Sequence, residues 1–275
     1  MAVCQRKAAQ AELGAATREF AARHSGGDRN CPARALSSIL SALLISAPRT
    51  RYLNSGRHNR APGHHMMKLM YSQTSPFVRR VRAAASELGL AERLKLEPIQ
   101  VAPGHENAVY AERVNPLRKI PALVLDDGGT VLVDSTVICQ YLDELAGGGR
   151  LIPREGVQRW RVLSQQAIAQ GMTDALVLAR YETALRPEPL RWTDWVRDQQ
   201  DRFWSGIAWF ERRAETASPA GEIDISQLAL ACCLGYAEFR FAELDWPAKA
   251  PRLNAWYRRI AERPSLRHTD PRLEA

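Results

Sequence analysis

The sequence contains no apolar run long enough to cross a bilayer. Its most hydrophobic stretch covers residues 35–47, whereas a membrane-spanning helix needs about 20 consecutive apolar residues. Hydrophobic residues make up 45% of the chain and charged residues 25%, which is typical of an ordinary globular protein. We therefore expect no membrane anchor and no membrane partner.

Cysteine is scarce and is never arranged in a CxxC pair. The chain has five cysteines, and their irregular spacing indicates a reducing compartment and a cytoplasmic location. Cys232 and Cys233 are adjacent in an apolar helical run, so we interpret this pair as core. His64 and His65 lack a third and a fourth ligand, and we expect no metal site.

The positive charge is unevenly distributed along the chain. The formal net charge is +8, yet residues 1–66 hold ten Lys or Arg against three Asp or Glu, and the remaining residues hold 28 against 27. The chain from Met67 onward is thus almost neutral. A near-neutral protein offers nucleic acid little electrostatic attraction, so we expect no nucleic-acid partner.

Residues 1–66 lack the repeating apolar stripe of a packed domain, and we predict a disordered N-terminal extension. Three interpretations remain open: an Arg-rich organelle transit peptide, a secretory signal, and an upstream stretch translated from a start codon assigned too early. The paired Met66 and Met67 stand immediately before the first strand-like segment, which favours the third. A genuine transit peptide would change the expected cytoplasmic location.

Strand and helix signals alternate between residues 67 and 146. Short apolar-alternating segments predict strands, and longer segments with three- and four-residue apolar spacing predict helices. Their order is βαβ-α-ββ-α, which indicates a small α/β domain. The strands are expected at 67–72, 93–101, 121–127 and 130–135, and the helices at 74–90, 104–116 and 135–147.

Residues 155–271 carry only helical signals, and they follow a linker at 147–154 that contains three consecutive glycines. Glycine and proline interrupt regular structure, which places a domain boundary at this linker. We predict an all-helical bundle domain beyond it, with helices at 157–181, 190–216, 225–241 and 253–263.

Ser75 and Pro76 lie between the first strand and the first helix, where helices prefer an N-cap and a first-turn proline. Capping alone explains both residues. The alternative is chemical, because a helix N-terminus favours an anion such as a thiolate. Lowering a thiol pKa from about 8.5 to about 6.5 needs about 2.7 kcal/mol, and the helix dipole supplies at most about 2 kcal/mol. A hydrogen bond from the Ser75 hydroxyl to the sulfur would supply the rest.

Ile120 and Pro121 lead directly into an apolar strand. A proline at a strand entry marks an unusual backbone. A cis peptide bond here would turn the backbone of Ile120 outward to pair with an extended peptide ligand. An ordinary trans proline is the alternative that the sequence alone favours.

Asp134 and Ser135 lie where the last strand meets the next helix. Either residue is a good N-cap, which is a sufficient structural explanation. A carboxylate and a hydroxyl at a helix N-terminus can also receive an amino-acid head group, with Asp134 binding its ammonium and Ser135 its carboxylate.

Five segments in this order resemble the cytosolic glutathione transferase family over residues 67–271, and the first resembles its bacterial serine-type members. The resemblance implies a thioredoxin-like glutathione-binding domain at 67–146 and an all-helical domain at 155–271. The segments are TSPFVRRVR, NPLRKIPALVLDDG, VDSTVICQYLDE, IDISQLAL and PRLNAWYRRIAERPSLRHTDP.

The resemblance also implies residue roles. Asp134 stands where most members have Glu, which shortens its reach by one methylene, and Gln227 stands where the capping box begun by Asp224 usually has Asp. The implied glutathione site comprises Ser75 for the thiolate, Lys119 for the glycyl carboxylate, the Ile120 backbone for the cysteinyl part, cis Pro121, and Asp134 with Ser135 for the γ-glutamyl part.

As an enzyme of this family, the chain would use glutathione as cosubstrate, with no metal, and would conjugate its thiolate to hydrophobic electrophilic small molecules as a homodimer. A glutathione-binding stress or regulatory protein with little turnover is the alternative. A glutathione-dependent thiol reductase is disfavoured, because Ser75 stands where that chemistry needs a cysteine.

Two further patterns have less specific interpretations. The RRVR run at 79–82 is expected to form a solvated helix face, with at most one arginine toward the active-site cleft. The candidates for lining an apolar pocket for the second substrate are Tyr110, Met172, Tyr181 and Tyr236.

Overall fold

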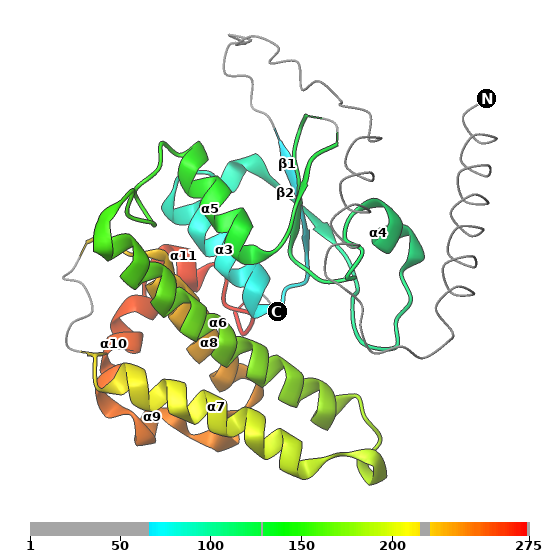
Figure 1. Ribbon diagram of the computed structural model, residues 1–275, viewed down its shortest axis with the longest axis vertical. Helices are drawn as coiled ribbons and strands as arrows, with labels where there is room; N and C mark the ends of the chain where they lie inside the picture. The colour runs from blue at the N-terminus through cyan, green and yellow to red at the C-terminus, as the bar shows by residue number, and fades with distance from the viewer. Residues whose placement is uncertain (1–65, 128, 215–220, 274–275) are drawn as a thin grey trace, which may run out of the picture. The chain divides into compact units, whose positions relative to one another are not determined.

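The computed structural model describes residues 66–127, 129–214 and 221–273 (Figure 1). The predictions for residues 1–65, including the N-terminal extension and the His64–His65 pair, lie outside the described residues. Among the described helices, none is long and apolar enough to cross a membrane.

The first part is a mixed sheet with helices, in the predicted βαβ-α-ββ-α order. The sheet order is β2-β1-β3-β4, in which β1 and β2 are parallel and the other neighbours are antiparallel. The elements are β1 Met67–Tyr71, α3 Pro76–Glu87, β2 Leu94–Pro98, α4 Ala108–Arg113, β3 Ala122–Val124, β4 Val131–Leu132 and α5 Ser135–Leu145.

The strand β1 lies between β2 and β3 in the sheet, and its side chains alternate between buried and exposed positions at its start. Met67 and Leu69 are buried while Lys68 between them is exposed, as expected for a strand with one face in the core. The chain reverses after α3 at Gly89, whose φ of 71° suits the left-handed region, and Leu90 N–H then donates to the carbonyl of Ala85 at 2.7 Å. This C-cap geometry directs the chain back toward β2.

The second part is helical, as predicted, and α6 and α8 pack closely together. Its helices are α6 Gly156–Ala184, α7 Thr193–Glu211, α8 Ile225–Arg240, α9 Trp246–Lys249, α10 Pro251–Ala261 and α11 Pro264–Arg267. Gly206 lets α7 approach α6, because a Cβ there would overlap the side chain of Met172. Met172 is therefore a packing residue of the bundle core rather than an evident pocket wall.

The helix α8 lies in the core and begins with the capping box expected from the sequence. The Asp224 carboxylate accepts from Ser226 N at 2.8 Å and Gln227 N at 3.0 Å, and Gln227 Oε1 accepts from Asp224 N at 3.0 Å. Cys232 and Cys233 are both buried, which confirms their interpretation as core. Burial raises the pKa of the Cys233 thiol to about 12.

The prediction of a solvated face at residues 79–82 is wrong for its first two arginines. Arg79 is 4% exposed and Arg80 is 3% exposed. The reason is that α3 packs against α5 and also against α8 of the helical part, so the side of α3 away from the sheet is covered as well. Both guanidinium groups must find partners inside the protein.

Candidate functional site

Ser75 is the N-cap of α3, directly after β1 and its short turn. Its Oγ accepts a hydrogen bond from Val78 N at 3.3 Å, and Pro76 follows at the first helical position. A serine hydroxyl that accepts through a lone pair still has its proton to donate. Capping and anion binding are therefore compatible, and Ser75 could donate to an anion at the N-terminus of α3.

The Ile120–Pro121 peptide bond is cis. Within the described part of the chain, neither backbone group of Ile120 has a hydrogen-bond partner. An exposed pair of backbone groups beside a sheet can bind an extended peptide. The geometry at Ile120 is thus suited to the ligand pairing that the sequence suggested.

The carbonyl of the preceding residue is firmly held. Lys119 O accepts from the Tyr110 hydroxyl at 2.8 Å and from Asn115 Nδ2 at 2.8 Å. Tyr110 is buried, and burial raises its pKa to about 12, so it stays a hydrogen-bond donor at neutral pH. Tyr110 supports the loop before Pro121, a role that the sequence did not reveal.

Asp134 and Ser135 begin α5 in different environments. Asp134 is the exposed N-cap, whose Oδ1 accepts from Thr136 N at 2.8 Å and Val137 N at 3.4 Å. Ser135 is 1% exposed, and its hydroxyl accepts a hydrogen bond from Arg80. The helix N-terminus therefore presents a carboxylate outward and has a buried cation behind it.

Arg80 was not among the predicted site residues. Its Nη2 also donates to Gln170 Oε1 at 2.6 Å and lies 3.5 Å from Thr136 Oγ1. All the acceptors that the described structure gives it are uncharged. An arginine doublet between apolar helix positions, here Val78 and Val81, was the available signal of a buried cation.

Asp174 connects α6 to the same region. Gln170 Nε2 donates to both of its carboxylate oxygens, at 3.2 and 3.3 Å. Partial burial raises the pKa of Asp174, with a further contribution from the charge of Asp134, while Lys119 and Arg80 act in the opposite direction. These electrostatic contributions indicate that Lys119, Arg80 and Asp134 lie near the carboxylate of Asp174.

The predicted site residues are thus placed on three segments. Ser75 lies on the same helix as Arg80, about 7.5 Å away along its axis, and Asp134 with Ser135 begins the neighbouring helix. Lys119, exposed before the cis proline, faces the same charges. Among the described residues there is no cluster of three potential metal ligands.

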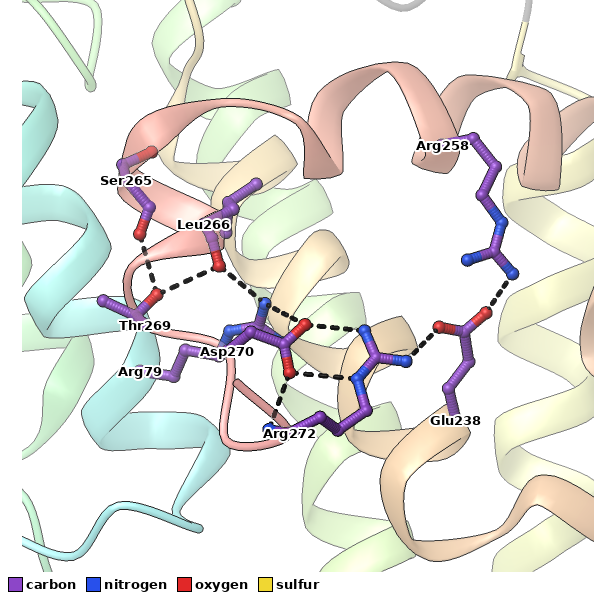
Figure 2. A network of polar contacts seen from close by, with 8 residues as sticks. All are labelled: Arg79, Glu238, Arg258, Ser265, Leu266, Thr269, Asp270 and Arg272. Carbon is purple, nitrogen blue, oxygen red and sulfur yellow. Dashed lines mark hydrogen bonds and ion pairs between the residues drawn. The ribbon is translucent and has the colours of Figure 1, made fainter. Parts of the chain in front are cut away.

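Arg79, next to Arg80, points to the other end of the chain (Figure 2). Its Nη2 donates to the carbonyl of Leu266 at 2.9 Å and lies 3.5 Å from Asp270 Oδ2. Asp270 also accepts from Arg272 Nη2 at 2.6 Å and Nε at 3.0 Å, and Arg272 reaches Glu238 of α8 at 2.8 Å. The C-terminal segment is in this way attached to α3, one turn after Ser75.

Comparison with known proteins identifies the class. Family models for the glutathione S-transferase N-terminal and C-terminal domains match residues 69–150 and 193–259. A crystal structure of a glutathione transferase family member from Pseudomonas fluorescens Pf-5, with bound glutathione, is 42% identical, with a TM-score of 0.70, and the match covers 74% of this chain and 98% of that one. The chain belongs to the glutathione S-transferase family.

Two more relatives extend this similarity. A second Pseudomonas fluorescens Pf-5 structure, with bound S-(propanoic acid)-glutathione, is 42% identical at a TM-score of 0.67, covering 74% of this chain and 99% of that chain. The uncharacterized GST-like protein YibF of Escherichia coli (strain K12) is 28% identical over 206 residues, which is 74% of this chain and 98% of YibF. The serine-type assignment within the family stays a prediction.

Proposed function

We propose that the protein binds glutathione and transfers its thiolate to electrophilic small molecules. The observation that carries this proposal is the Ser75 hydroxyl at the N-terminus of α3, which caps the helix as an acceptor and retains its proton for an anion. A hydrogen bond to a charged group contributes about 1.5 to 3 kcal/mol. Together with the helix N-terminus, it would lower the pKa of a thiol bound there.

The remaining contacts would hold the rest of the tripeptide. The Ile120 backbone beside cis Pro121, which has no hydrogen-bond partner among the described residues, would bind the cysteinyl part, and Lys119 the glycyl carboxylate. Asp134 would bind the γ-glutamyl ammonium, and Ser135 with Arg80 behind it the γ-glutamyl carboxylate. The relatives solved with glutathione and with S-(propanoic acid)-glutathione support glutathione as the ligand of this protein.

Catalysis would consist of thiolate formation and positioning. The sulfur forms a bond to the electrophilic carbon, and either a leaving group departs with its bonding electron pair or, in an addition, the neighbouring carbon takes a proton from solvent. No cysteine of the described chain is placed for thiol reduction, because Cys139, Cys232 and Cys233 are all buried. Burial raises the pKa of each of these thiols, which supports conjugation over reduction.

We also propose a homodimer and a cytoplasmic location, as the family resemblance and the cysteine pattern suggest. Several large apolar side chains on the surface of α5 and α6 are exposed and would be covered by a partner subunit. These are Val137, Val157 and Trp160.

Calorimetric titration with glutathione, followed by a conjugation assay with 1-chloro-2,4-dinitrobenzene, tests the proposal. We expect binding and turnover in the wild type. Ser75→Ala should retain binding and shift the pH dependence of turnover upward, while Ser86→Ala in the last turn of the same helix should leave both unchanged. Binding without turnover would instead favour a regulatory glutathione-binding protein, and absence of binding would refute both functions.

A further inference from the structure

The helices α6 and α8 run parallel, and two side-chain contacts define which of their residues lie opposite each other. Ser226 Oγ, in the first turn of α8, lies 3.2 Å from Oε1 of Gln165, which is nine residues after the start of α6. Farther along, the side chain of Thr173 lies within hydrogen-bonding reach of Cys233. Seven residues on α8 thus correspond to eight on α6, a difference that close-packed parallel helices accommodate.

Extending this correspondence by another eight residues on α6 and seven on α8 brings two arginines and two tyrosines together. Eight residues after Thr173 is Tyr181, preceded by Arg180, and seven residues after Cys233 is Arg240. Tyr236 is one turn before Arg240 on the same face of α8. The four side chains at 180, 181, 236 and 240 therefore form one cluster, which we call the basic cluster.

Electrostatics agree with this placement. Partial burial lowers the pKa of Arg240, and the charge of Arg180 lowers it further. Burial raises the pKa of Tyr236 to about 12, with a small contribution from Tyr181, whereas Arg240 and Arg180 act in the opposite direction. Burial also raises the pKa of Tyr181, so both phenols stay protonated at neutral pH and can donate hydrogen bonds.

Among the described residues, no carboxylate pairs with the two arginines of the basic cluster. Neither the Arg180 nor the Arg240 guanidinium forms an ion pair or hydrogen bond anywhere in the described structure, and Arg240 only stacks over Phe239 at 3.9 Å. The acidic neighbours have other partners. Glu182 pairs with Arg186 at 2.8 Å, and Glu238 pairs with Arg258 and Arg272. Two adjacent half-buried cations without a carboxylate would be stabilised by an added anion.

The basic cluster is continuous with the candidate glutathione site along α6. Gln170 and Asp174 face Arg80 and Asp134, and Tyr181 lies seven residues after Asp174, on the same helix face to within about 20° and about 10 Å farther along. An extended tripeptide also spans about 10 Å. The length of glutathione is therefore comparable to the distance along α6 between the candidate glutathione site and the cluster.

We propose that this enzyme acts on electrophiles that carry a carboxylate or a similar anionic group, and that Arg180 and Arg240, with the hydroxyls of Tyr181 and Tyr236, bind that group. This inference rests on the proposed transferase function and specifies its substrate class. In a substitution on 4-chloro-3-nitrobenzoate, the thiolate sulfur bonds to the ring carbon that carries chlorine, and chloride leaves with the bonding electron pair. The ring carboxylate takes no part in bond making and serves as the handle that the cluster holds.

A pair of glutathione conjugates tests the cluster without requiring turnover. S-(2-carboxyethyl)glutathione and S-(2-carbamoylethyl)glutathione have nearly the same shape and differ in charge. Calorimetry on the wild type should show at least about 10-fold tighter binding of the carboxylate, the size of one good charge-assisted hydrogen bond. The variant R180Q/R240Q should lose this preference and still bind glutathione normally.

Matched variants separate charge from folding. Arg161→Gln removes an exposed arginine of α6 that bonds only Gln158 in the described structure, and it should keep the preference. Arg240→Lys keeps the positive charge and should retain most of the preference for the carboxylate conjugate. Kinetics with 4-chloro-3-nitrobenzoate and its carboxamide should follow the same pattern, with the double variant losing about 10-fold in kcat/KM for the carboxylate alone.

The outcomes distinguish the two claims. If wild-type protein binds glutathione but shows equal affinity for the two conjugates, the anion site is refuted and the glutathione site stands. A preference that survives in R180Q/R240Q also refutes the site. If the wild type binds neither glutathione nor the conjugates, the proposed function itself fails.

Discussion

Arg79 and Arg80 are neighbours on α3, and both are almost completely buried, yet their surroundings differ. Arg79 meets the carboxylate of Asp270 at 3.5 Å, within a network that continues through Arg272 and Glu238 to Arg258. Within the part of the chain that the structure describes, Arg80 donates hydrogen bonds only to the neutral oxygens of Ser135, Thr136 and Gln170. A buried cation normally has an anionic partner. The charge of Arg79 is therefore satisfied by the fold, whereas under the proposed function the γ-glutamyl carboxylate of glutathione would satisfy that of Arg80.

The largest expected effect is on folding. Asp270→Ala would leave Arg79 buried without its carboxylate, and breaking such a pair typically costs about 3 to 5 kcal/mol. We expect a loss near the lower value, because Asp270 keeps some contact with solvent. Urea unfolding measures it, with Glu262→Gln as a control that removes an exposed partner of Arg267. Equal stability of Asp270→Ala and the control would show that the network is not structural.

The second prediction concerns ligand affinity. Arg80→Met should weaken glutathione binding by about 10- to 100-fold, because it removes the cation behind Ser135 that would stabilise the bound γ-glutamyl carboxylate. Arg79→Met should lower the free energy of unfolding and leave the glutathione Kd within about twofold in the folded protein. Calorimetry measures the glutathione Kd of both variants, and urea unfolding measures their stability. Equal losses of affinity would contradict the distinction between the two arginines.

A smaller effect is expected at the start of α8. Asp224→Ala removes the carboxylate that caps this helix, and losing an N-cap costs about 1 kcal/mol. The change is remote from both arginines, so it should lower the unfolding midpoint in urea without altering the glutathione Kd. A large change in affinity would indicate that α8 influences the site through its position.

The smallest effect is a dependence of stability on pH. Burial tends to raise the pKa of Asp270, but hydrogen bonds from Arg272 and the charge of Arg79 outweigh it, and the pKa is lowered. A carboxylate with a lowered pKa contributes stability that is complete above its unfolded pKa of about 3.9 and is lost as pH falls through the folded pKa. Below about pH 4, the wild type should therefore lose stability more steeply than Asp270→Asn. Parallel pH profiles from urea unfolding would refute the assignment.

The sequence predicted those features that depend on local chemistry. The caps at Ser75, Asp134 and Asp224 follow from short-range hydrogen bonds, and each lies at the start of the helix where the sequence placed it. The sequence alone favoured a trans bond before Pro121, whereas the bond is cis, because nothing local decides between the isomers.

The features that the sequence missed depend on distant partners. Arg79 is 187 residues from Leu266, and Arg80 is 90 residues from Gln170, so no local pattern announces either contact. Tyr110 was interpreted as a pocket residue, yet its hydroxyl holds Lys119 O, because aromatic composition does not reveal where a hydroxyl points.

The role of Ser75 is tested most directly by a pH titration of glutathione bound to the protein. The ultraviolet absorbance of the thiolate reports the titration. If Ser75 and the N-terminus of α3 stabilise the thiolate, the pKa of bound glutathione will be well below the free value of about 8.5. In Ser75→Ala it will rise by about 1 unit or more, equivalent to losing one hydrogen bond to a charged group. An identical titration in wild type and Ser75→Ala would contradict the central role of this serine.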